Sequence, residues 1–200
     1  ALDKTVEEIR KIEKYTVNMI GDSRIQSFLE LADSAGDRSS LMSLTPELRN
    51  RILSYTDYDN IIQAIYLMDN QGHIYSNQGQ PKMQHFLDEN PVLKNRTEAS
   101  AVWYTEEDCI VLYRIVNNNT TDLTRKTGAL CIFIDKELFE ERLNHLMMEE
   151  NQHYLMEGSG RNFFLVSERN AVLNEGDIVS TREQDGWVLK TWIDKDTAYA

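Results

Sequence analysis

The stretch from Val102 to Leu143 places the strongest constraint on how this 200-residue chain folds. It opens with two runs rich in β-branched and aromatic residues, which meet at the acidic turn Glu106-Glu107-Asp108. A polar loop and a third apolar run follow, and Asp135 ends that run where an amphipathic helix begins. Strands that follow one another closely in sequence usually pair in one antiparallel sheet. The block therefore predicts most of one sheet, which the rest of the chain supports or completes.

The N-terminal segment predicts a long helix. Apolar residues recur at helical spacing from Leu2 to about Ala32, a length of roughly 45 Å in an α-helix. Gly21-Asp22-Ser23 is its weak point, because glycine costs about 1 kcal/mol inside a helix and Asp22 or Ser23 can cap a new one. Two interpretations remain open: a helix whose stripe partly faces a second copy of itself, or a kinked pair of helices packed wholly on the sheet.

Shorter elements are predicted between this helix and the central block. A polar loop covers Ser34 to Ser40, and Thr45-Pro46-Glu47 is typical of a helix start, so a helix is predicted from there to about Tyr58. Two strands, Ile61 to Met68 and His73 to Ser76, are predicted to form a hairpin.

The C-terminal part is predicted to hold little regular structure. The helix after Asp135 is expected to continue to about Met156, followed by a flexible link at Gly158-Ser159-Gly160. At most three short strands are expected beyond it, at residues 163–166, 171–173 and 187–193. So few strands rarely make an independent domain, so this part should lean on its neighbour.

Composition excludes some classes of function. The formal net charge of −12 repels the phosphate backbone, so no nucleic-acid partner is expected. No apolar run approaches the roughly 20 residues of a membrane-spanning helix. Because the sequence begins abruptly within a helical pattern, we expect it to be a piece of a larger protein.

Neither a catalytic nor a metal centre is predicted. No serine or cysteine lies in a nucleophile motif, and no dinucleotide fingerprint is complete, so no enzyme activity and no cofactor are expected. Cys109 and Cys131 should be buried thiols, because their predicted strands do not bring them face to face. The histidines lack metal-ligand spacing, and we interpret them as surface residues: His73, His85, His145 and His153.

The order of the elements and several phrases resemble Cache-type sensor domains, specifically the double-Cache extracellular domains of bacterial transmembrane sensor histidine kinases. The phrases are Asp22 to Leu29, Ile65 to Tyr75 and Gly128 to Phe139. The segment Asp185 to Leu189 resembles the last strand that these domains place before the second membrane span.

This resemblance implies an α+β fold with a long N-terminal helix, a PAS-like antiparallel sheet and a smaller second PAS-like module. The implied divisions are a stalk helix and linker at 1–44, a membrane-distal Cache module at 45–147 and a short membrane-proximal module at 148–200. It also implies a signal-sensing role on the extracytoplasmic face of the bacterial cell membrane, in a receptor anchored by spans outside this sequence. The implied partners are a small-molecule ligand or a solute-binding protein, together with a second copy that pairs through the N-terminal helix.

Polar and aromatic residues on the central sheet are the predicted ligand site. They offer stacking surface, a cation and a carboxylate to a small molecule. Side chains alternate along a strand, so Tyr113 and Arg114 must face opposite sides. Core packing or a surface ion pair is the alternative for each of them. The predicted residues are Tyr66, Trp103, Tyr104, Tyr113, Arg114 and Asp135.

Two other functions fit the same sequence. The sensor could belong to a chemotaxis receptor or to a cyclic-dinucleotide enzyme, because the output domain lies outside the chain. A cytosolic, acidic interaction domain whose long helix docks a partner is the third hypothesis. The arginine-and-aromatic signature of amino-acid-binding Cache domains is not visible, although Trp103-Tyr104 matches a fragment of it.

Overall fold

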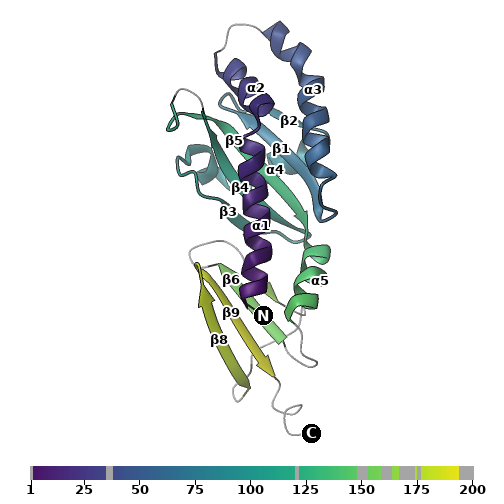
Figure 1. Ribbon diagram of the computed structural model, residues 1–200, viewed down its shortest axis with the longest axis vertical. Coiled ribbons are helices and arrows are strands. Elements are labelled where there is room, and N and C mark those ends of the chain that lie inside the picture. Colours follow the sequence, from purple (N-terminus) through teal and green to yellow (C-terminus); the bar gives the residue numbers. More distant parts are fainter. Residues whose placement is uncertain are drawn as a thin grey trace. The chain divides into compact units, whose positions relative to one another are not determined.

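The computed structural model describes residues 2–34, 38–119, 122–147, 153–158, 164–166, 174 and 177–193. It confirms an α+β fold in which helices come first and antiparallel sheets follow (Figure 1). The three N-terminal helices are α1 (Leu2–Ile20), α2 (Ser23–Asp33) and α3 (Arg38–Thr56).

The predicted long helix is two helices, broken where the sequence is weakest. Asp22 caps α2, since its side chain accepts hydrogen bonds from the backbone N–H groups of Arg24 and Ile25 at 2.9 and 3.4 Å. The apolar stripe of α1 is buried within the chain, with Val6, Ile9 and Met19 at 0% exposure. The expectation that part of this stripe faces outward is therefore wrong, and the kinked pair of helices is the interpretation that holds.

Helix α3 begins earlier than the sequence predicts. It starts at Arg38, so the predicted polar loop is helical at its end, and Pro46 lies inside the helix rather than in its first turn. Proline removes one backbone hydrogen bond from a helix interior. Leu48 and Ile52 are four residues apart and are buried at 3% and 1% exposure, so packing of this face offsets that loss.

The larger sheet has the strand order β2-β1-β5-β4-β3 within the described residues. Strand β1 pairs with both β2 and β5 in antiparallel register, which confirms the predicted hairpin. The central block forms β3, β4 and β5, followed by helix α5, as the sequence predicts. The bounds are β1 (Ile62–Asp69), β2 (Ile74–Ser76), β3 (Val102–Thr105), β4 (Cys109–Asn117), β5 (Lys126–Asp135) and α5 (Lys136–Met147).

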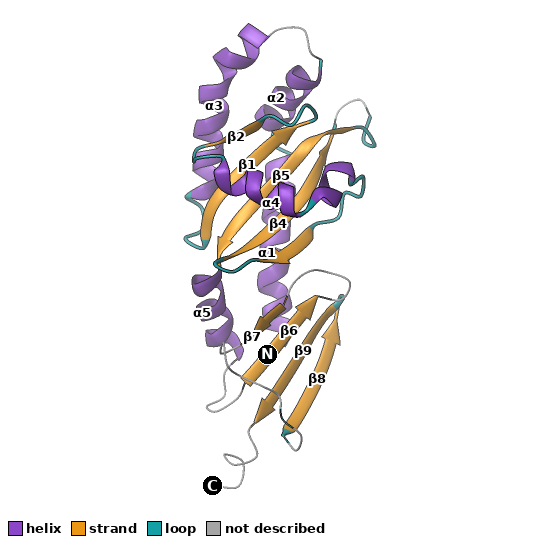
Figure 2. Ribbon diagram, turned by 180° about the vertical axis from the view of Figure 1, so that it is seen from behind, coloured by secondary structure: helices purple, strands orange, loops and turns teal. Residues whose placement is uncertain are grey.

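Strand β1 is buried almost throughout, although one-sided sheets alternate buried and exposed residues. The reason is that helices α2 and α3 cover one face, whereas α4 (Pro81–Glu89) and the 3-10 helix η1 (Pro91–Asn95) cross the other (Figures 1 and 2).

The smaller sheet has the strand order β7-β6-β9-β8 in the described part of the chain. Its strands are β6 (His153–Gly158), β7 (Phe164–Val166), β8 (Ile178–Gln184) and β9 (Trp187–Ile193). The predicted helix through Met156 is wrong there, because β6 pairs with β9 over its whole length. Strand β8 was not predicted, and the strand predicted at residues 171–173 lies outside the described residues.

The chain divides into two compact units that are not consecutive in sequence. One comprises residues 1–12, 103–110 and 135–200, and the other comprises residues 13–102 and 111–134. The proposed divisions at 44 and 147 follow chain order instead and stay a prediction. Cys109 and Cys131 are buried and form no disulfide with each other, as expected. Of the described helices, none combines the length and the apolar character that crossing a membrane requires.

Candidate functional site

Residues 79–96, named the covering segment here, lie over the face of the larger sheet opposite α2 and α3 (Figure 2). Pro81 stands in the first turn of α4, where its fixed φ and missing N–H suit a helix start. The apolar side of the segment packs inward through Met83, Phe86, Leu87 and Leu93.

An aromatic cluster joins the covering segment to the sheet. The ring of Phe133 on β5 meets those of Tyr66 on β1 and Phe86 on α4 edge to face, with centroids 5.2 and 5.9 Å apart. Tyr66 is 1% exposed. Such pairs add about 0.5–1.5 kcal/mol each beyond the area that they bury.

Tyrosine hydroxyl groups of the sheet hold both ends of the covering segment. Tyr66 donates to the carbonyl of Gly79 at 3.0 Å, and Tyr113 donates to the carbonyl of Leu93 at 3.2 Å. The side chain of Gln80 adds a bond from the segment back to the carbonyl of Ile74 at 2.7 Å. Because buried hydroxyl groups need partners, each bond is costly to break unless another acceptor replaces the carbonyl.

Lys126, at the start of β5, also holds the segment. Its ammonium group donates to the carbonyls of Lys94 and Arg96 at 3.4 and 3.3 Å. Partial burial lowers the pKa of Lys126 below its ordinary value. Sequence reasoning missed this residue, because a lysine beside a polar loop gives no signal that it is half-buried.

Two of the six predicted site residues, Tyr66 and Tyr113, contact the covering segment, each at a different end of it. Arg114 faces the opposite way, as strand alternation requires, toward the side where Glu13 of α1 lies. Burial lowers the pKa of Arg114, while the charge of Glu13 acts in the other direction. Its Nε atom is buried without a hydrogen-bond partner.

The other three predicted residues belong to the unit that holds the smaller sheet. Trp103 is fully buried and packs edge to face against Trp187 on β9, with centroids 6.1 Å apart. Asp135 caps α5 by accepting from the N–H of Leu138 at 2.9 Å. Tyr104 is buried at 6% exposure. A ligand-binding role for these residues stays a prediction.

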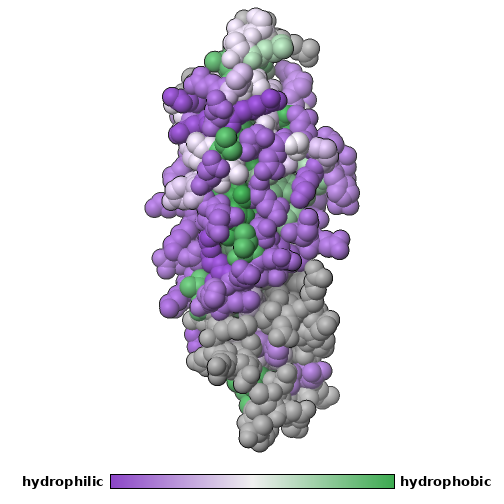
Figure 3. All heavy atoms as spheres, turned by 90° about the vertical axis from the view of Figure 1, so that its right-hand side faces the viewer, coloured by the Kyte–Doolittle hydropathy of each residue, from purple (hydrophilic) through white to green (hydrophobic). Residues whose placement is uncertain are grey.

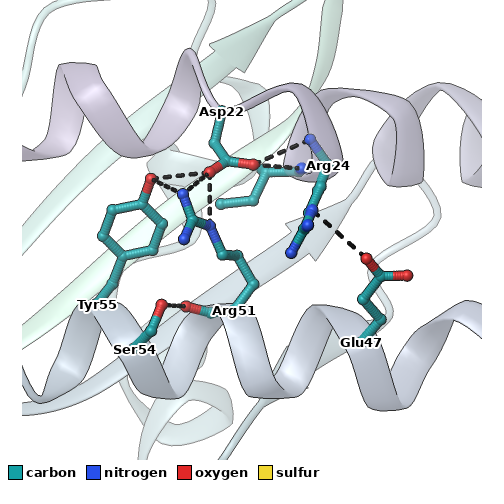
Figure 4. A network of polar contacts seen from close by, with 7 residues as sticks. Asp22, Arg24, Glu47, Arg51, Ser54 and Tyr55 are labelled. Carbon is teal, nitrogen blue, oxygen red and sulfur yellow. Dashed lines mark hydrogen bonds and ion pairs between the residues drawn. The ribbon is translucent and has the colours of Figure 1, made fainter.

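A second polar cluster connects α2 with α3 (Figure 4). The carboxylate of Asp22 accepts from Nε of Arg51 at 2.7 Å and from the hydroxyl of Tyr55 at 2.9 Å. Arg24 pairs with Glu47 at 3.4 Å beside it. These contacts fix the two helices against each other.

A small groove of about 190 Å³ also lies between α2 and α3. Figure 3 shows the side of the molecule that carries α3 as mostly hydrophilic, with small apolar patches. The two charged groups that line the groove, Arg24 and Glu47, already bind each other, so neither marks it as a ligand site. Among the described residues, no cluster of three His, Cys, Asp or Glu side chains is placed to hold a metal ion.

Comparison with known proteins identifies the fold. No family model matches the sequence, and no curated protein matches it. Among solved structures, the ligand-binding domain of the Campylobacter jejuni chemoreceptor Tlp3, in complex with L-valine, is similar with a TM-score of 0.56. The identity is 11%, and the match covers 98% of this chain and 90% of that one. The sensory domain of the same receptor with isoleucine bound gives the same TM-score and identity.

The second kind of similar structure is the extracellular domain of rpHK1S-Z16, which is described as a histidine kinase. Its TM-score is 0.52 at 10% identity, and the match covers 100% of this chain and 98% of that one. One of these similar structures is thus a ligand-binding sensory domain, and the other is an extracellular domain. The chain thus has the Cache or PAS-like fold of extracellular sensor domains.

Proposed function

We propose that this chain is the extracytoplasmic, non-enzymatic sensor domain of a bacterial transmembrane receptor and binds a small molecule beneath the covering segment. The observation that carries the proposal is that side-chain donors of the sheet hold both ends of this segment through its backbone carbonyls. The fold similarity to two kinds of receptor domain supports the sensory role.

Binding would work by exchange of acceptors. A ligand oxygen that enters beneath the segment replaces the carbonyl of Gly79 or Leu93 as the partner of a tyrosine hydroxyl. The covering segment then changes its position relative to the sheet while the hydroxyl stays satisfied. A ligand shifts such an equilibrium only by its difference in affinity for the two states. We favour a small molecule over a solute-binding protein because both hydroxyl groups belong to residues that are at most 1% exposed.

Two stretches of regular structure run from one compact unit into the other and would transmit the movement of the covering segment. Helix α1 begins in one compact unit and ends in the other, and β5 runs directly into α5 at the boundary between them. Within the first unit, Arg10 of α1 forms an ion pair with Asp185 in the turn between β8 and β9. Movement of α1 would thereby reach the C-terminal strands.

A two-component sensor histidine kinase is our first choice for the parent receptor, and a chemotaxis receptor is the second. The similarity to Tlp3 favours the chemotaxis receptor, and the similarity to rpHK1S-Z16 favours the kinase. In either parent we propose a homodimer that pairs through residues of α1 outside its buried apolar stripe, where Val17 is 47% exposed.

Thermal unfolding in the presence of amino acids, organic acids, sugars and nucleosides tests the proposal. A compound at a hundred times its Kd adds about 2.7 kcal/mol to the free energy of unfolding, which raises Tm by several degrees. Tyr113→Phe should weaken this response, because it removes one donor beneath the segment. Tyr58→Phe, at a site 73% exposed, is the matched control and should leave it unchanged. A compound that stabilises the protein and Tyr113→Phe equally would contradict the proposed site.

A further inference from the structure

Strand β8 lies at the edge of the smaller sheet and is long for an edge strand (Figure 2). The strand order β7-β6-β9-β8 leaves one side of β8 without a neighbouring strand in the described part of the chain. The other sheet edges are short, because β2 and β7 have three residues each and β3 has four, whereas β8 has seven. Natural proteins keep edge strands short because a long edge offers unpaired N–H and C=O groups to another chain.

Strand β8 also lacks the features that usually protect an edge. Lysine, proline and β-bulges are common protection, but β8 contains neither residue and pairs with β9 at seven consecutive positions. Ile178 and Val179 are 56% and 44% exposed, and adjacent residues of a strand lie on opposite faces. Both faces of β8 therefore offer apolar surface beside the open edge. Another strand is the partner that such an edge fits.

The turn between β8 and β9 determines which residues direct their backbone outward. Asp185 and Gly186 have φ angles of 52° and 76°, as a two-residue type I′ turn requires. Such a turn closes on a hydrogen-bonded pair, which is Gln184 with Trp187. Residues bonded to the neighbouring strand alternate with residues that direct their N–H and C=O groups away from it. The outward groups therefore belong to Val179, Thr181 and Glu183.

We propose that β8 pairs antiparallel with β8 of a second copy of this chain, with Thr181 opposite Thr181. Outward-facing residues must pair with each other, so only every second register is possible. The register centred on Thr181 pairs the whole strand and places Val179 opposite Glu183. The next register toward the turn would place Arg182 opposite Arg182, and like charges directly opposite each other are destabilising. The next register in the other direction pairs fewer residues.

A second copy suits this edge because β8 is electrically neutral in an acidic protein. The formal net charge of −12 makes two copies repel each other on average. In β8 the charges of Arg182 and Glu183 cancel, and the proposed register sets no like charges directly opposite each other. The pairing involves neither α1 nor the covering segment, so it does not rest on the proposed function. In a receptor it would join two copies through their C-terminal strands.

Disulfide trapping tests the register. Thr181→Cys should give a disulfide-linked dimer under mild oxidation, because opposite residues of an antiparallel pair have Cα atoms about 5.5 Å apart, within disulfide range. Ser180→Cys is the matched control, since its two cysteines would lie about 7–8 Å apart on a diagonal and should not join. The native Cys109 and Cys131 are buried and should not interfere. Equal yields for the two variants, or trapping of Ser180→Cys alone, would overturn the proposed pairing.

Sedimentation velocity of the whole chain over a range of concentrations measures the association without a cross-link. One strand pair is a small interface, so a reversible dimer at high micromolar to millimolar concentration is expected. Thr181→Pro should abolish it, because proline removes an outward N–H that pairing with β9 does not use. Val179→Lys should weaken it at least tenfold by adding the charge that protects natural edges.

Leu123→Lys is the matched control for the added charge, at a site 71% exposed outside this sheet, and should associate like the unmodified chain. The Tm of each variant shows whether its fold is retained, and Val179→Lys keeps the test decisive if Thr181→Pro does not fold. Association that persists in both edge variants would assign the dimer to another surface and overturn the inference. A chain that stays monomeric at every concentration would overturn it as well.

Discussion

Asp22 holds the junction of the N-terminal helices through one carboxylate. One of its oxygens caps α2, and the other accepts from Arg51 and Tyr55 of α3 (Figure 4). Tyr15 of α1 completes the junction by donating to the carbonyl of Tyr55 at 2.5 Å. Burial acts to raise the pKa of Asp22, but the hydrogen bonds from Arg51, Tyr55 and the N–H of Arg24 together hold it below its usual range.

Replacing this carboxylate should destabilise the fold in two steps. Asp22→Asn keeps a cap acceptor and loses the charge, so about 1 kcal/mol of unfolding free energy should be lost. Asp22→Ala loses the cap as well, and the loss should reach about 2–3 kcal/mol. Urea unfolding at pH 7 measures both. Equal stability of the alanine variant and the unmodified chain would show that the junction does not depend on Asp22.

The same carboxylate should give an acid-dependent component of stability. A carboxyl group with a lowered pKa in the folded state stabilises the fold above its unfolded pKa of about 3.9. This contribution is lost as the pH falls through the lower folded pKa. Unfolding free energies measured between neutral pH and acid should fall more steeply for the unmodified chain than for Asp22→Asn. Parallel curves would contradict the lowered pKa.

At Gly128 the packing leaves no room for a side chain. A Cβ atom there would overlap the carbonyl oxygen of Met68 and would lie 3.0 Å from Cδ2 of Leu29. Gly128→Ala should therefore cost about 3 kcal/mol or more, because a backbone atom cannot give way as a side chain can. Gly79→Ala is the control, since its nearest neighbour is Cδ of Pro81 at an ordinary 3.5 Å. Chemical denaturation compares the two, and similar losses would contradict this reason for glycine.

At the scale of elements, the sequence predicts those helices and strands whose apolar residues follow the spacing of the element itself. The β1–β2 hairpin, the three strands of the central block and the start of α5 all follow from runs of apolar residues and the turns between them. The break at Asp22 also follows from the sequence, because a glycine and a capping side chain adjoin there. Local chemistry decides these features.

Other elements depend on the strand that they pair with rather than on an apolar pattern of their own. In β6, Tyr154 and Met156 are buried and alternate with less buried residues, which is typical of a strand. Because this short pattern comes soon after the helical pattern of α5, the sequence predicts a longer helix instead. Strand β8 has six exposed residues out of seven, so it carries no apolar pattern and is held by its pairing with β9. Pairing with β9, rather than propensity, specifies both strands: the partner is distant in sequence for β6, and it follows directly after the turn Asp185-Gly186 for β8.

The candidate site shows the same division. Tyr66 and Tyr113 are predictable as aromatic residues on central strands, and alternation correctly sets Arg114 apart from Tyr113. Their acceptors are the backbone carbonyls of Gly79 and Leu93. Every residue has a backbone carbonyl, so the sequence does not indicate which ones accept these bonds. Lys126 was missed for a related reason, since its burial results from the covering segment rather than from its own neighbours in sequence.

At the scale of the molecule, the proposed function assigns sensing and transmission to different parts of one chain. The covering segment and the sheet face beneath it belong to one compact unit, whereas the β8–β9 turn that binds Arg10 belongs to the other. Helix α1 contributes to both units. This arrangement fits a domain in which a ligand acts on one unit and the other reports the change.

Hydrogen–deuterium exchange, with and without the first compound that raises Tm, tests the central claim most directly. The account predicts slowed amide exchange in the covering segment, residues 79–96, and in strands β1 and β5 beneath it. Local exchange reports the opening of a segment, so a ligand bound between the covering segment and the sheet should protect the residues that it contacts. Protection confined to α2 and α3 or to the smaller sheet, with unchanged exchange in residues 79–96, would contradict the claim.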